Sequence, residues 1–165
     1  MEVCPGCKAQ LPRHDGAPHP YFGASPSCWA LYSEVLGREY SDPALMTLHR
    51  LTVDAYAVQH PGDPDRRAVQ SVWAHLVGLY LTVERGSSHT FARKVIAALV
   101  RESDGLVWLV PPADLGRVTV VDVAAAGSPS AHLAIVRVWA DVAWSAWYPH
   151  HSAIRTCADR ITARL

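Results

Sequence analysis

The sequence lacks net charge and has no long apolar run. Its 15 lysine and arginine residues balance 15 aspartate and glutamate residues, so nothing draws the chain generally toward a polyanion or an anionic membrane surface. No apolar stretch approaches the roughly 20 residues that a membrane-spanning helix needs, and no basic segment followed by an apolar one precedes the first cysteines. We therefore expect a soluble, cytoplasmic protein that binds neither nucleic acid nor a membrane.

Internal repeats and low-complexity segments are also absent. The chain has 165 residues, half of them hydrophobic, which is enough for one core and too short for two comfortable ones. We expect residues 1–165 to form a single domain. Residues 1–26 are rich in proline and glycine and predict an irregular arm, and residues 27–165 predict a helical bundle.

Hydrophobic periodicity of about 3.6 residues predicts an all-α protein. Ser25 or Ser27 is a candidate N-cap for the first helix, and Asp42 followed by proline is typical of a second helix start. The stretch VTVVDVAAAG is typical of either a short strand or a short helix, and Thr119 as a cap favours the helix. The predicted helices cover residues 26–40, 42–60, 64–85 and 89–102, a short segment after Thr119, and residues 129–165 with an interruption at Pro149.

The motif CPGC, at residues 4–7, and a third cysteine at Cys28 predict a metal site. In a reducing compartment cysteines serve as metal ligands, reactive thiols or core residues rather than as disulfides. Proline and glycine between Cys4 and Cys7 are typical of a zinc knuckle, and Cys28 lies at a helix N-terminus, where the dipole favours a thiolate. The alternative is a free thiol pair beside a buried Cys28. A redox pair is disfavoured because no strand is predicted before Cys4.

A structural zinc ion needs a fourth ligand, and the fourth cysteine of a full ribbon is missing. If the first two helices form an antiparallel hairpin, residues near position 60 extend toward the arm. His60 is therefore the best-placed ligand, and His14 and His19 are alternatives because the arm could fold either one back. The predicted site consists of Cys4, Cys7, Cys28 and His60.

A second group of histidines predicts a pocket. If two helices form a hairpin about Gly62, residues equally distant from Gly62 face each other, and His49 and His75 are both thirteen residues away. His150 begins a row of inward-facing residues on the last helix. Three inward histidines could hold a metal ion or shuttle protons, with Tyr56 as a hydrogen-bond donor. Alternatively, each histidine bonds a neighbour in the core. His132 is expected at the surface.

The motifs CPGC, GASPSCWALY, HRLTVDAYAVQHPG, SVWAHLVGLYLTVERG and WSAWYPHH together resemble a bacterial family of small proteins classed only as a domain of unknown function. The resemblance covers nearly the whole chain and implies no activity. It departs at Lys8, where a knuckle commonly has glycine.

Two functions follow from these patterns. One is a small zinc-binding helical protein whose histidine-lined pocket binds or transforms a small molecule by metal-dependent or acid/base chemistry. The other is a zinc-stapled protein–protein interaction module without catalytic activity, which docks through its arm and its tryptophan-rich C-terminal helix.

Overall fold

Helices dominate the computed structural model, which describes residues 1–165, with 62% of the residues helical. The predicted all-α class is confirmed. The helices are α1 (Pro26–Tyr40), α2 (Pro43–Met46), α3 (His49–Gln59), α4 (Arg66–Leu79), α5 (His89–Arg101), α6 (Val120–Ala124), α7 (Pro129–Ala146) and α8 (His151–Thr162). Short turns of other helix types occupy Tyr80–Glu84, Ser103–Gly105 and Tyr148–His150, and β1 (Glu2–Val3) and β2 (Gln10–Leu11) form the only sheet.

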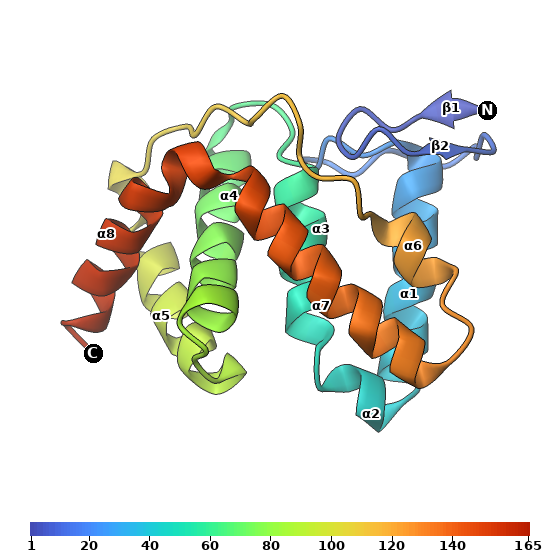
Figure 1. Ribbon diagram of the computed structural model, residues 1–165. Coiled ribbons are helices and arrows are strands. Elements are labelled where there is room, and N and C mark those ends of the chain that lie inside the picture. Colours follow the sequence, from blue (N-terminus) through green and yellow to red (C-terminus); the bar gives the residue numbers. More distant parts are fainter.

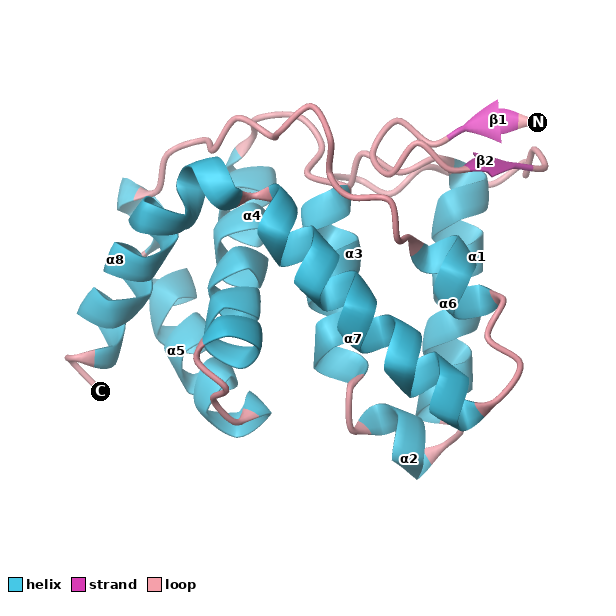
Figure 2. Ribbon diagram, in the orientation of Figure 1, coloured by secondary structure: helices cyan, strands magenta, loops and turns pink.

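The helices form a bundle whose connections are divided between its two ends. Helices α3 and α4 occupy its middle, α7 crosses α3 diagonally, and α5 and α8 lie far from α1 and α6 (Figure 1). The β1–β2 hairpin, the turn after α3 and the crossover before α6 gather at the same end of the bundle (Figure 2). Segments from three parts of the chain therefore surround the end of α3.

Side-chain caps fix the helix starts that the sequence predicts. Ser25 accepts from the backbone N–H of Cys28 at 3.2 Å, and Asp42 accepts from that of Ala44 at 2.8 Å. At α6 the Thr119 hydroxyl and the Asp122 carboxylate form a capping box. These contacts satisfy N–H groups that have no partner within the helix, so helix is the correct interpretation of VTVVDVAAAG.

The second predicted helix, 42–60, is not continuous. It breaks at Thr47 and Leu48, where the Thr47 hydroxyl donates to the Ala44 carbonyl at 2.7 Å and the Leu48 N–H bonds Leu45 at 3.1 Å. Such a side-chain bond competes with the α-helical pattern. The break turns α2 into a separate corner between α1 and α3, so α3 starts anew at His49 and its far end reaches the arm.

The tryptophans of the last two helices belong to the core. Trp139 and Trp147 are fully buried and Trp144 is nearly so. The Trp147 indole donates to the Val58 carbonyl at 3.1 Å, which ties α7 to the end of α3. The C-terminal helices thus present no tryptophan surface.

Candidate metal centre

A short hairpin positions the first two cysteines. Glu2 pairs with Leu11 and Val3 with Gln10, and inside this ladder the Cys4 N–H bonds Ala9 at 2.9 Å. A strand does precede Cys4, contrary to expectation, because two residues are too few to show an alternating pattern. Lys8 has a φ of 63°, the left-handed conformation for which glycine is usual in a knuckle. The departure of Lys8 from the usual motif therefore leaves the turn intact.

The structure brings together the four side chains that the sequence selects as ligands. The ligand atoms of Cys4, Cys7, Cys28 and His60 all lie within 4.8 Å of one another, and the group could hold a metal ion. The two sulfurs of Cys7 and Cys28 are 3.8 Å apart, and the Cys28 sulfur lies 3.4 Å from His60 Nε2. A tetrahedron with metal–sulfur bonds of about 2.3 Å and a metal–nitrogen bond of about 2.0 Å has edges of roughly 3.8 and 3.5 Å. The measured separations match these edges.

The cluster is closed to solvent. Cys4, Cys28 and His60 have no exposed surface, and Cys7 is 8% exposed. Catalytic metal sites keep one position open for water or substrate, whereas structural sites use all four positions for protein ligands. The burial of all four residues is that of a structural site.

Tyr56 orients two of the ligands. His60 Nδ1 donates to the Tyr56 carbonyl at 2.7 Å, which orients the ring so that Nε2 faces the sulfur of Cys28. In the neutral ring the lone pair is then on Nε2, the nitrogen that can bind a metal ion. The Tyr56 hydroxyl donates to the Cys28 sulfur at 3.7 Å. Burial raises the pKa of this phenol above its ordinary value, so the donor keeps its proton. Tyr56, predicted as a donor in a pocket with the histidines, donates to Cys28 of the cysteine–histidine cluster instead.

Neighbouring side chains shift the pKa values of Cys4 and His60. Hydrogen bonds from Cys28 and Cys7 lower the pKa of the Cys4 thiol, because they stabilise a thiolate. Burial disfavours the charged imidazole of His60, but the adjacent Cys4 and Cys7 outweigh burial and raise its pKa to about 9. A buried site that stabilises negative sulfur beside positive charge suits a cation in place of those protons.

Close backbone packing holds the knuckle against α3. A Cβ added at Gly6 would lie 2.5 Å from the Gln59 carbonyl oxygen and 2.5 Å from His60 Cδ2. The Gly23 N–H donates to the His60 carbonyl at 3.2 Å, so the arm is bound on the other side as well. His19, a rival fourth ligand, accepts from the Phe22 N–H at 3.1 Å instead, and His14 is exposed.

The structure does not bring His49, His75 and His150 together. His49 Nδ1 bonds Glu39 at 2.7 Å, and His75 Nδ1 bonds Asp54 at 2.7 Å. His150 Nε2 donates to the Val110 carbonyl at 2.8 Å. The predicted pairing of His49 with His75 is wrong, because Asp54 rather than His49 lies opposite His75 in the α3–α4 hairpin. The midpoint of the hairpin lies beyond Gly62, because the turn continues to Asp65 before α4 begins. The prediction had taken Gly62 itself as the midpoint.

The sequence analysis did not predict the hydrogen-bond network around the buried Glu39. Glu39 has no exposed surface and accepts from Thr52 at 2.5 Å and from His132 Nε2 at 2.9 Å, as well as bonding His49. His132, expected at the surface, is only 1% exposed. The signal was present, since Glu39 follows Tyr32 by seven residues on the buried face of α1. Three hydrogen bonds explain how a buried carboxylate is tolerated there.

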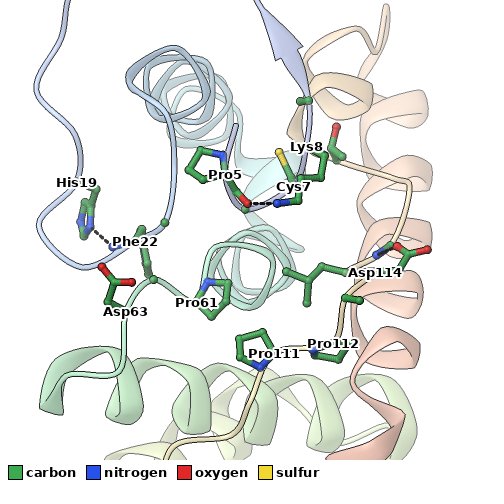
Figure 3. Close-up of a pocket in the computed structure, with 18 of the residues that line it drawn as sticks. Pro5, Cys7, Lys8, His19, Phe22, Pro61, Asp63, Pro111, Pro112 and Asp114 are labelled. Carbon is green, nitrogen blue, oxygen red and sulfur yellow. Dashed lines mark hydrogen bonds between the residues drawn. The ribbon is translucent and has the colours of Figure 1, made fainter. Parts of the chain in front are cut away.

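A groove of about 1050 Å³ lies beside the knuckle. Figure 3 shows Cys7 and Lys8 on one side of it and Pro111 and Pro112 of the crossover on another. The remaining walls come from arm residues 19–23, the turn at residues 61–65 and the start of α6. The groove therefore exists only while the arm, the turn and the crossover are held in place.

Gln59 holds the crossover wall. Its amide nitrogen donates to the Leu115 carbonyl at 3.0 Å and to the Val118 carbonyl at 2.8 Å, and its oxygen accepts from the Trp139 indole at 2.8 Å. Gln59 directly precedes His60 of the cysteine–histidine cluster. The sequence showed a polar residue in an apolar stretch here, which is a signal of a buried hydrogen-bonding role.

Comparison with known proteins adds the family and no activity. No helix is both long and apolar enough to cross a membrane. No curated protein and no solved structure matches the chain. A model of the family of unknown function DUF5946 matches residues 2–148, a span that contains all four cluster residues, the groove and Gln59. The chain therefore belongs to the DUF5946 family.

Proposed function

We propose that this protein is a zinc-stapled binding protein. One structural zinc ion, held by Cys4, Cys7, Cys28 and His60, fastens the arm to the bundle and so builds the groove, which binds a small ligand carrying positive charge. The observation that carries the proposal is the closed, four-residue cluster directly behind the groove, with Cys7 common to both.

The ligand set favours zinc over other metals. Three thiolates and one imidazole are soft and borderline ligands, which select zinc over the oxygen-seeking magnesium and calcium ions. Sulfur–sulfur and sulfur–nitrogen separations of 3.8 and 3.4 Å suit a tetrahedral ion. Zinc has no redox chemistry, so it serves here as a cross-link between the arm, α1 and α3.

The charge of the groove favours a cationic ligand. Burial lowers the pKa of His19 below its ordinary value, so this lining residue is neutral near pH 7. Among the other side chains that line the groove, four are acidic and two are basic: Asp63, Asp65, Asp114 and Asp122 against Lys8 and Arg117. Asp63 and Asp114 stand on opposite sides of Pro61 (Figure 3). An ammonium or guanidinium group, from a free amine or from a peptide side chain, complements this excess of negative charge.

Metal content tests the first half of the proposal. We expect one zinc ion per chain in protein purified without added metal, measured by mass spectrometry. Cys28→Ser removes a ligand and should abolish zinc binding. Cys157→Ser is the matched control, because Cys157 is a buried cysteine of α8 outside the cluster, and it should retain zinc. A wild-type protein without zinc, or equal zinc in the two variants, would refute the staple.

Ligand binding tests the second half. We expect 1,4-diaminobutane, or a short arginine-containing peptide, to raise the melting temperature of the zinc-loaded protein, while succinate of the same length as the diamine does not. The probe that raises the melting temperature shows whether the ligand is a free amine or a peptide side chain. Asp63→Asn removes a carboxylate from an exposed side chain and should weaken that shift. Stabilisation by succinate alone would overturn the charge argument while leaving the zinc result untouched.

A further inference from the structure

A buried carboxylate lies between α3 and α4, away from the metal centre. Asp54 has no exposed surface. It accepts from His75 Nδ1 at 2.7 Å and from Arg50 Nε at 2.9 Å. A Cβ added at Gly78 would lie 2.4 Å from Asp54 Oδ2, so only glycine leaves room for the carboxylate at this crossing. Asp54 is therefore fixed on three sides by α3 and α4.

This arrangement fixes the orientation of His75. Because Nδ1–H donates to Asp54, the neutral ring carries its lone pair on Nε2. The His75 side chain is 17% exposed, and it lines a surface pocket of about 330 Å³. A buried carboxylate thus holds one nitrogen of a partly exposed imidazole that lines a pocket, and proteins position a general base in this way.

The pocket supplies positive charge and a hydroxyl beside His75. Arg67, Ser71 and His75 follow one another at intervals of four residues along α4, so they lie on one face of that helix. All three line the pocket, together with Tyr21, Gln70, Ala74 and Val100. No acidic side chain lines it. In contrast to the groove, this pocket therefore favours a negatively charged molecule.

We propose that Asp54 and His75 form a proton-transfer dyad, and that the pocket takes a small molecule whose oxyanionic group, a phosphate or a carboxylate, is held by Arg67. In the step, the Nε2 lone pair accepts a proton from an O–H group of the bound molecule or of water. The electron pair of that O–H bond stays on its oxygen, and Asp54 stabilises the imidazolium that forms. Neither the zinc ion nor the ligand of the groove takes part.

Carbethoxylation with diethyl pyrocarbonate tests the dyad. In that reaction the Nε2 lone pair forms a bond to a reagent carbonyl and ethyl carbonate leaves, so the rate reports the nucleophilicity of Nε2. We expect His75 to react readily in the wild type and several-fold more slowly in Asp54→Asn. The exposed His14 serves as the internal reference, with an unchanged rate. An unreactive His75, or equal rates in the two proteins, would refute the dyad, because a merely structural Asp54 would change the melting temperature alone.

Phenylphosphonate, an inert molecule with an oxyanion at one end, tests the anion site. It should protect His75 of the wild type from carbethoxylation, whereas benzyl alcohol at the same concentration should not. Arg67→Gln removes the positive charge that holds the oxyanion, so it should abolish the protection, measured as the ratio of the protected to the unprotected rate within each protein. Equal protection in both proteins would overturn the role of Arg67. This comparison remains decisive if Asp54→Asn fails to fold.

Discussion

Replacement of Gln59 tests how the end of α3 holds the groove together. Gln59 has no exposed surface, and its side chain satisfies two carbonyls of the crossover and the indole N–H of Trp139. Methionine has a similar length and flexibility, so Gln59→Met fills the same space without making any of these bonds. Two part-buried carbonyls and the buried indole N–H then lose their partner.

The structure sets the size of the effect. A buried polar group left without a hydrogen bond costs about 1 to 3 kcal/mol. The Leu115 and Val118 carbonyls border the partly exposed crossover, where water can replace part of the loss, so we take about 1 kcal/mol for each and up to about 3 kcal/mol for the indole. The expected loss in the free energy of unfolding is therefore about 3 to 5 kcal/mol, a large share of the about 5 to 15 kcal/mol of a typical domain.

Urea unfolding measures this loss, with Gln70→Met as the matched control. Gln70 on α4 also bonds a carbonyl, that of Val100 at 3.3 Å, and the Ser103 hydroxyl at 3.1 Å, but near the surface. Water replaces those partners, so the control should lose less than about 1 kcal/mol. Hydrogen exchange should also quicken in residues 111–118 of the Gln59 variant. Losses of equal size in the two variants would refute the reasoning.

Two further predictions concern packing and pH. Gly6→Ala should abolish zinc binding in the mass-spectrometric assay, because its Cβ would overlap the Gln59 carbonyl oxygen at 2.5 Å, and retained zinc would contradict this packing. The Arg155 guanidinium lowers the pKa of the Glu84 carboxyl below 4.5, so this pair stabilises the fold above pH 4.5 and the contribution disappears as the pH falls through the lowered pKa. Unfolding of Glu84→Gln should therefore be easier than that of the wild type at pH 7 and equal to it at pH 2, and a difference that persists at pH 2 would refute the assignment.

Local signals in the sequence were enough to predict most helix starts and the turn that contains Cys4 and Cys7. Caps such as Ser25, Asp42 and Thr119 act within their own helix turn, so they are readable without the fold. The same holds for the spacing of Cys4 and Cys7, which depends on a tight turn within the hairpin. The break at Thr47 was missed because a single hydroxyl-to-carbonyl bond decided it against good helical periodicity.

Long-range packing decided the partners of the histidines. His49, His75 and His132 each bond a carboxylate from another helix, and the choice depends on the register between helices. A turn that extends a few residues further shifts that register by a full helical turn, about 5.4 Å. Taking Gly62 as the midpoint of the hairpin could not give the register between α3 and α4 to within one helical turn.

The sequence by itself determined the all-α class and most helix starts, and it selected the three cysteines of the cluster with His60 as the favoured fourth residue. The helix class and the helix starts depend on neighbours within a few positions, and the cluster residues follow from the Cys-x-x-Cys spacing and from the hairpin of the first two helices. Only the tertiary structure decided that the cluster is closed, that a charged groove lies beside it and that Asp54 meets His75. The burial of a side chain and its distance to a distant residue depend on how all the helices pack, because the interior is filled by side chains from the whole chain.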